Sequence, residues 1–261
     1  MTSREADTRV LRTGLSHCQS DASLRRGTKM AMNTDLVGSI ELTASAAIVV
    51  AALSIGFASD TGTRIRIAIG LSLWFVLVVI LAATRALYYE HGLGTPGLGL
   101  AIVIPIIILC LVVGRVQSLR ETFHRVPLWL LVAVHIVRLL GISFIILYTS
   151  HRLPAPFAPV AGWGDIFVGA TAVPVAWFAY RRPSNAPLAI WIWNAIGAFD
   201  LIAAVGLGVI SSPGPQRLIF AEPSAAIMTT VPWLLIPGFL VPLLFAVHVG
   251  IFARIARSDA A

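Results

Sequence analysis

The chain has 261 residues, of which 57% are hydrophobic and 12% are charged, and its formal net charge at pH 7 is +7. Soluble globular domains carry roughly 25% charged residues, so the composition excludes a water-soluble fold of this length and indicates a chain that uses lipid as its solvent. A pI near 10.4 would suggest nucleic-acid binding in a soluble protein, but here the arginines lie in a terminal segment and in short loops between apolar runs, so no nucleic-acid partner is expected.

Residues 1–35 form a polar, basic segment that precedes the first apolar run and does not resemble a signal peptide. We expect a disordered tail here, with Met30 or Met32 as an alternative start of the protein. All basic residues of the chain except Lys29 are arginines. This usage is typical of a GC-rich genome and leads us to expect a bacterial protein of the inner (plasma) membrane.

Seven segments between residues 36 and 255 are long and apolar enough to cross a bilayer, which requires about 20 mainly apolar residues. They predict an all-α membrane protein whose single domain is a bundle of seven transmembrane helices, followed by a short cytoplasmic tail at 256–261. The short connections predict antiparallel packing of neighbouring helices. The predicted spans cover 36–57, 67–87, 98–114, 128–148, 163–180, 188–210 and 229–253.

The distribution of arginines predicts the orientation of the bundle. Basic residues in short loops favour the cytoplasmic side, and the loops and helix ends of one side hold only Arg85, Arg152 and Arg217. The predicted topology therefore places the N-terminus outside and the C-terminus inside, although the basic residues of the tail oppose it. The group assigned to the cytoplasm comprises Arg64, Arg66, Arg115, Arg120, Arg125, Arg181, Arg182, Arg254 and Arg257.

Two charged residues lie near the middle of predicted spans, Arg138 in 128–148 and Asp200 in 188–210. A charge at the bilayer centre costs roughly 2.5–3.5 kcal/mol on insertion scales, so both side chains should face the bundle interior. An ion pair between them is the simplest way to keep both charges there. His135 precedes Arg138 by three residues and should share its helix face.

Three further polar side chains extend this core in the prediction. Asn194 and His248 lie at a depth similar to that of His135, closer to the cytoplasm, and are candidates for a second polar layer. Asp165 opens the fifth predicted span, where a carboxylate complements the helix dipole. It is interpreted either as a helix cap or as a binding residue at the outer mouth.

Motifs of several functional classes are absent from the sequence. It contains no phosphate-binding loop, no nucleophile elbow and no H-E-x-x-H zinc motif, so it points to neither an enzyme nor a metal site. No lysine lies in a predicted span, which excludes a retinal Schiff base. Cys18 and Cys110 lie in the tail and in an apolar run, so no disulfide is expected.

The leading functional prediction is a protein that binds or translocates a small solute, an ion or a proton through a polar intramembrane core. Two alternatives stay open. One is an electron-transfer membrane subunit with a b-type haem between His135 and His248. The other is a structural or accessory subunit of a membrane complex, with Arg138 and Asp200 as a clamp that fixes helix register. The lipid bilayer and a small solute or ion are the expected partners, and protein partners are not predicted.

Overall fold

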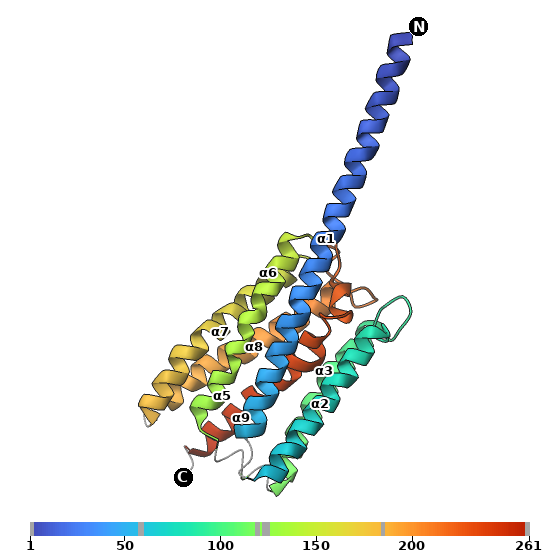
Figure 1. The fold of residues 1–261 in the computed structure, drawn as a ribbon. Helices are drawn as coiled ribbons and strands as arrows, with labels where there is room; N and C mark the ends of the chain where they lie inside the picture. The colour runs from blue at the N-terminus through green and yellow to red at the C-terminus, as the bar shows by residue number, and fades with distance from the viewer. Residues whose placement is uncertain (1–2, 57–59, 118–120, 122–125, 184–185, 259–261) are drawn as a thin grey trace.

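The computed structural model describes residues 3–56, 60–117, 121, 126–183 and 186–258, and for 3–26 and 257–258 it describes the backbone alone. Within these ranges the chain forms only helices and their connections (Figure 1). Seven helical segments are long and apolar enough to cross a membrane. The chain is a polytopic, all-helical membrane protein, which confirms the predicted fold class at this level.

Each predicted span coincides with one helical segment, and two of the seven are irregular. The fourth span consists of α5, a 3₁₀-helix (η1) and α6, and the seventh begins with a π-helix (η4) that continues into α9. The bounds are α1 (Ser3–Gly56), α2 (Thr61–Ala83), α3 (Gly94–Arg115), α5 (Leu128–Ala133), η1 (Val134–Gly141), α6 (Ile142–Thr149), α7 (Phe157–Arg181), α8 (Pro187–Ser211), η3 (Ala225–Thr229), η4 (Ile236–Leu240) and α9 (Val241–Ser258).

Two helices begin about six residues earlier than their apolar runs predicted. At the start of α2 the carboxylate of Asp60 accepts a hydrogen bond from the backbone N–H of Thr63 at 2.8 Å and caps the helix. A hydrogen bond from the Thr63 side chain, and to a smaller extent one from its backbone N–H, holds the pKa of Asp60 below its usual value. At the start of α7, Pro156 is the N-cap residue and Pro159 lies in the first turn, where a proline removes no helical hydrogen bond.

The last span begins later than predicted. The segment from Thr230 to Leu234, which contains Pro232, forms a bend and turns before η4, and the span covers Ile236–Ala256 instead of 229–253. α9 continues to Ser258, so the predicted tail at 256–261 starts as helix. Residues 259–261 lie outside the described residues, as do Arg120 and Arg125, two of the arginines used to predict orientation.

The N-terminal segment, for which a disordered tail was expected, is drawn from Ser3 onward as one helix continuous with the first span. α1 projects well beyond the bundle before it enters it (Figure 1). Near the bundle surface Asp35 forms an ion pair with Arg152 at 2.8 Å and accepts a hydrogen bond from the indole N–H of Trp233 at 2.9 Å. These bonds hold residues just before the predicted span against the segments that follow α6 and α8.

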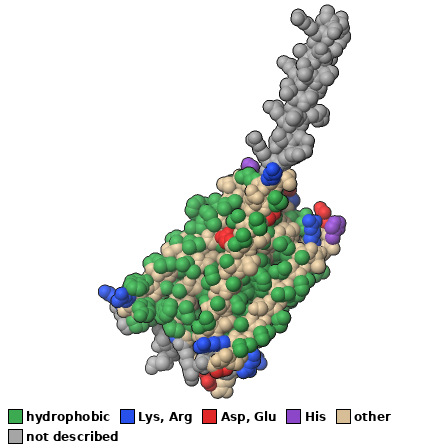
Figure 2. Space-filling model, in the orientation of Figure 1, with side chains coloured by type: hydrophobic (Ala, Val, Ile, Leu, Met, Phe, Trp, Pro, Cys, Tyr) green, Lys and Arg blue, Asp and Glu red, His purple; other side chains and the backbone are tan. Residues whose placement is uncertain are grey.

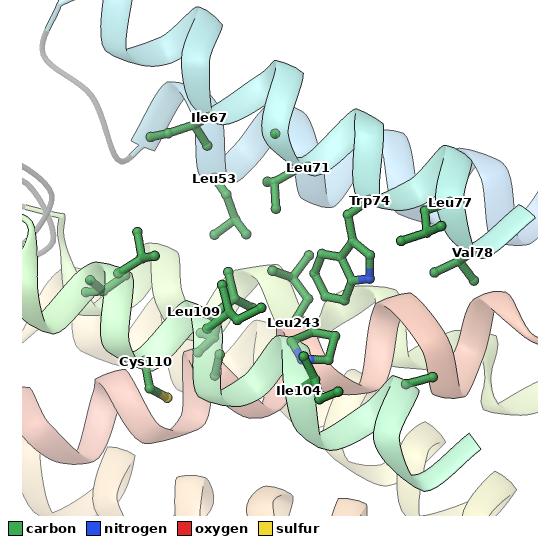
Figure 3. Close-up of a pocket in the computed structure, with 18 of the residues that line it drawn as sticks. Leu53, Ile67, Leu71, Trp74, Leu77, Val78, Ile104, Leu109, Cys110 and Leu243 are labelled. Carbon is green, nitrogen blue, oxygen red and sulfur yellow. The ribbon is translucent and has the colours of Figure 1, made fainter. Parts of the chain in front are cut away.

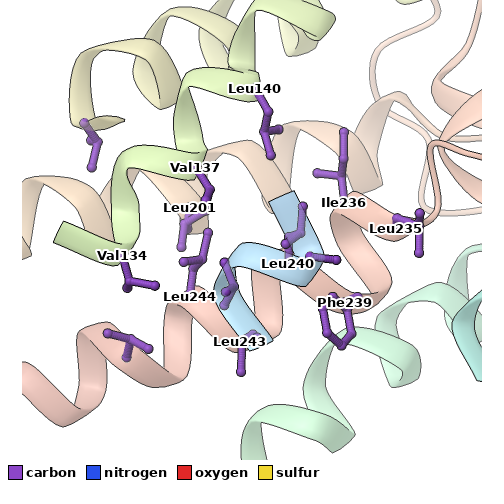
Figure 4. Packing of buried hydrophobic residues seen from close by; sticks show 14 of the residues in the cluster. Val134, Val137, Leu140, Leu201, Leu235, Ile236, Phe239, Leu240, Leu243 and Leu244 are labelled. Atoms are coloured by element: carbon purple, nitrogen blue, oxygen red, sulfur yellow. The ribbon is translucent and has the colours of Figure 1, made fainter. Parts of the chain in front are cut away.

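Apolar side chains cover most of the visible face of the bundle, and basic side chains gather near its ends (Figure 2). This is the surface expected of a protein embedded in hydrocarbon. Inside, Val137 and Leu140 of η1 face Leu201 of α8 and the leucines of η4 and α9, among them Leu240 (Figure 4). The fourth, sixth and seventh spans therefore share one apolar core, which surrounds the polar residues described next.

Close backbone contacts fix α7 against the fourth span. α7 packs against α5, η1, α6 and α8, and its buried face is rich in alanine and glycine. An added Cβ on Gly141 would lie 2.5 Å from the carbonyl oxygen of Gly162 and 2.7 Å from the Cβ of Asp165. Small residues allow such approach in membrane helices. The approach brings Asp165 within reach of η1.

Candidate functional site

The fourth span presents two polar side chains from its 3₁₀ segment. A 3₁₀-helix has three residues per turn, so residues three apart are aligned along it. His135 and Arg138 have this spacing within η1, and their side chains are 0% and 1% exposed. Both therefore point into the protein, as their burial cost in lipid requires.

Arg138 bonds to three other elements. Its Nε donates to Oδ1 of Asp165 on α7 at 2.6 Å, and its Nη2 donates to Oδ2 of Asp200 on α8. Its Nη1 donates to the carbonyl oxygen of Gly197 at 3.0 Å and lies 3.3 Å from Nε2 of His248 on α9. All three nitrogens of the guanidinium thus have partners, and together they link the fourth span to the fifth, sixth and seventh.

This cluster contains two acidic side chains but only one basic side chain. One guanidinium faces the carboxylates of Asp165 and Asp200, whose side chains are only 9% and 13% exposed. With both carboxylates ionised the trio carries a formal charge of −1. An uncompensated charge inside a membrane protein is costly, so the trio is suited to take up one positive charge.

Two glycines leave the space that the carboxylate of Asp200 and the ring of His248 occupy. An added Cβ on Gly164 would overlap the carboxylate of Asp200, and one on Gly197 would lie 2.6 Å from Cε1 of His248. Gly197 also supplies the carbonyl oxygen that Arg138 contacts. Bulkier residues at either position would push the charged groups apart.

The second layer contains His248 and Asn194, which bond to each other twice. Nδ2 of Asn194 donates to the backbone carbonyl of His248 at 3.0 Å, so its Oδ1 faces Nδ1 of the imidazole at 2.6 Å as an acceptor. This pairing assigns the proton of a neutral His248 to Nδ1. Nε2 is then free to accept from Arg138.

His135 packs against this layer and keeps one nitrogen without a partner. Its ring centroid lies 4.2 Å from that of His248 and 5.3 Å from that of Trp193. Nδ1 lies 3.0 Å from the carbonyl oxygen of Leu131, to which it donates, whereas the buried Nε2 has no hydrogen-bond partner. His135 therefore offers an unsatisfied proton acceptor inside the bundle.

Residues 95–256 match the family model described as Domain of unknown function (DUF8737). The chain belongs to this family. The matched region runs from α3 to α9 and contains all of the residues of the polar core, which are His135, Arg138, Asp165, Asn194, Asp200 and His248. α1 and α2 precede it. No match was found among curated proteins or among solved structures.

Within the DUF8737 region the structure brings the predicted site residues into one connected network. The predicted Arg138–Asp200 ion pair is present, and the predicted layer of His135, Asn194 and His248 lies directly beside it. Asp165 is the exception to its prediction. It lies two turns inside α7, buried against Arg138, and neither caps a helix nor lies at the mouth of the bundle.

The sequence did not identify Asp165 as the second carboxylate of the trio, and it did not single out Gly197 or Trp193. The predicted helix start at 163 placed Asp165 near the membrane surface, and moving that start to Phe157 carries it inward. Two glycines were the available signals. Gly164 is adjacent to Asp165, and Gly197 precedes Asp200 by three residues. Such glycines permit the close approach that a buried charge needs.

The histidine pair does not fit a haem ligated from both sides. Two axial ligands must lie on opposite faces of the macrocycle, and the rings of His135 and His248 are in contact, with 4.2 Å between centroids and 43° between planes. Arg138 also lies at Nε2 of His248, where the iron would bind. Among the described residues, no group of three or more His, Cys, Asp or Glu side chains is placed to hold a metal ion.

Proposed function

We propose that this family member binds a proton between Asp165 and Asp200 in the membrane interior and moves it across the bilayer, alone or with a small solute. The observation that carries the proposal is the pairing of one guanidinium with two carboxylates, that of Asp165, which is buried, and that of Asp200, which is 13% exposed. A proton on either carboxylate brings the trio to formal neutrality. Intramembrane acidic and histidine residues commonly form proton pathways.

Asp200 is the carboxylate proposed to exchange the proton. Its side chain is the more exposed of the two, and Arg138 retains Asp165, Gly197 and His248 as partners when Asp200 leaves. Protonation weakens the charge-assisted bond between α8 and η1. Of the two bonds from Arg138 to the sixth span, only the one to the carbonyl of Gly197 is then left. This weaker connection favours movement of the sixth span relative to the fourth, which is the kind of two-state change that transport requires.

His135 is proposed to take part as a relay toward the other side of the membrane. Its Nε2 is a buried acceptor with no partner, and its ring touches that of His248. A proton released by Asp200 thus has an acceptor one layer closer to the proposed cytoplasmic side.

The membrane and the orientation are part of the proposal. The arginine-rich composition supports a bacterial inner membrane, and the basic residues at the α7–α8 connection and at the start of α2 support a cytoplasmic location for those ends. Figure 1 shows the two termini at opposite ends of the bundle. This is consistent with an external N-terminus and a cytoplasmic C-terminus.

The test is proton flux into proteoliposomes that contain a pH-sensitive dye, with valinomycin and potassium used to dissipate the membrane potential. We expect Asp200→Asn to lower the flux at least tenfold, because an amide cannot carry the proton. Glu90→Gln, which neutralises an exposed carboxylate at the α2–α3 connection, should leave the flux unchanged. Repeating the assay with a sodium gradient in place of the pH gradient shows whether the transported ion is a proton or another small cation. Wild-type flux equal to that of empty liposomes would refute transport.

A structural or accessory role has one observation in its favour, since every nitrogen of Arg138 already has a partner. Such a network can serve as a clamp that fixes helix register. In that case the wild-type protein carries no proton. The neutral triple variant Arg138→Gln, Asp165→Asn and Asp200→Asn would then fold and assemble as the wild type does.

A further inference from the structure

A long apolar groove lies between α2 and α3 and is lined at its back by α1 and α9. Its volume is about 1000 Å³, at the upper end of the range of about 300–1,000 Å³ for small-molecule sites. Figure 3 shows Leu71, Trp74 and Val78 of α2 facing Ile104 and Leu109 of α3 across the space, with Leu243 of α9 beside them. None of the polar core residues lines it.

The groove exists because α2 and α3 pack against different neighbours. α2 lies mainly against α1, whereas α3 lies mainly against α9. Glycines at Gly70 and Gly114 add room, because a Cβ built on either would meet no atom within 4 Å. Leu77 and Ile104 line the groove and are about half exposed. The groove is therefore open to whatever surrounds the bundle at this depth.

The walls and the length of the groove require an apolar occupant with extended chains. Water needs polar partners to occupy a cavity, and this lining is almost entirely hydrocarbon. The lining residues Arg66 and Leu81 of α2 are fifteen positions apart, about 22 Å along the helix at roughly 1.5 Å per residue. The groove is therefore long enough to hold the acyl chains of a lipid from one leaflet, which contributes roughly 15 Å to a hydrocarbon core about 30 Å thick.

The two ends of the groove differ in chemistry. Thr63 and Arg66 line one end, near the start of α2, whereas Leu87 and Leu93 line the other. A guanidinium is well suited to bind phosphate. An occupant with a single anionic head would therefore place that head at Arg66 and extend its chains toward Leu93.

We propose that the groove is a binding site for an anionic diacyl phospholipid, with the phosphate at Arg66 and the acyl chains between α2 and α3. The lipid enters sideways from the leaflet at the α2 N-terminus. This site is separate from the proton-binding residues and does not depend on their proposed role. α2 contributes much of the site although it precedes the family region.

The experiment is native mass spectrometry of the full-length protein, titrated in detergent with phosphatidylglycerol and with phosphatidylcholine of the same acyl chains. We expect saturable binding of one phosphatidylglycerol, about tenfold tighter than phosphatidylcholine. Arg66→Gln should abolish this preference by removing a charge-assisted contact, a loss of about tenfold. Arg182→Gln, at an exposed arginine after α7, is its matched control and should leave the preference intact.

Filling the groove tests its location. Gly70→Phe and Gly114→Phe each place a ring in the open groove, and each should lower phosphatidylglycerol binding at least tenfold. Gly206→Phe on α8 is the control, because a Cβ there also meets no atom within 4 Å but lies outside the groove. Retained binding in both filled variants, provided that they elute as monodisperse protein, would overturn the proposal. Equal binding of both lipids would also overturn it.

Discussion

Arg138 is the residue on which the polar core depends. It is 1% exposed and holds two carboxylates, a backbone carbonyl and an imidazole around one guanidinium. A buried ion pair contributes little net stability, but removal of one partner leaves an uncompensated charge. The trio formed with Asp165 and Asp200 has this property in an extreme form, because its single cation serves both acids.

The first prediction is that Arg138→Gln destabilises the protein much more than neutralisation of the whole trio does. The single variant leaves two carboxylates without a cation, and we expect a loss of about 3–5 kcal/mol in the free energy of unfolding. Adding Asp165→Asn and Asp200→Asn should restore most of it. Thermal unfolding in detergent measures both, with Arg182→Gln as the exposed control. Equal loss in the single and triple variants would show that packing, not charge, makes Arg138 important.

At this scale the sequence predicted which residues meet but not how many charges are involved. Arg138 and Asp200 could be paired because each lies in the middle of an apolar run, where the cost of an isolated charge leaves few alternatives. Asp165 could not be added, because its depth depends on where α7 begins. Two prolines near that point resembled a loop and turned out to start the helix.

At the scale of elements, the 3₁₀ segment η1 is what aligns His135 with Arg138. Its backbone also approaches that of α7 closely: Gly141 lies against Gly162, and a Cβ on Gly169 would lie 2.7 Å from the backbone nitrogen of Leu139. Long apolar helices without charged faces obtain their packing from such small residues. The same contacts determine the distance between Arg138 and Asp165.

The second prediction is that Gly141→Ala is destabilising while Gly206→Ala is not. The added methyl on Gly141 meets the carbonyl of Gly162 and the side chain of Asp165, and overpacking of this kind costs about 1–3 kcal/mol. The methyl on Gly206 enters open space, and replacing a helical glycine is neutral or slightly favourable. Thermal unfolding of the two variants side by side provides the comparison. If Gly141→Ala matched its control, α7 would not be held against η1 by contact at this point.

Hydropathy predicted the number of spans because a bilayer dictates helix length, but it could not locate the irregular segments. Nothing in the run from Val134 to Gly141 distinguishes 3₁₀ from α geometry, which results from packing against α7. Pro237 lies at the start of the π-helix η4, where a proline removes a helical donor. The groove was also beyond prediction, because helices that are apolar all round give no indication of which face meets protein and which meets lipid.

At the scale of the whole molecule, α9 separates two different environments. Its residues Leu243, Val247 and Gly250 line the groove, whereas His248 and Ile251 are fully buried in the bundle. The charged core is thus one helix away from a surface that lipid chains can enter. This arrangement places the helix that carries His248 between the charged core and the groove.

The third prediction concerns the orientation of the molecule in its membrane. After Cys18→Ser and Cys110→Ala, single cysteines are introduced as Glu90→Cys at the α2–α3 connection and as Pro183→Cys at the α7–α8 connection, both at exposed positions. The arginines beside Pro183 should keep that end in the cytoplasm. On intact cells a membrane-impermeant maleimide should label Glu90→Cys, and it should label Pro183→Cys only after permeabilisation.

The basic residues of the N-terminal segment oppose this orientation, so a variant that lacks residues 1–29 and begins at Met30 sharpens the test. If the connections dominate, the labelling pattern is the same with and without residues 1–29, because charges close to several spans outweigh those of one terminal segment. If the pattern is inverted only in the full-length chain, the N-terminal arginines set the topology. The end that carries Arg66 would then face outward, and the proposed phospholipid would come from the outer leaflet.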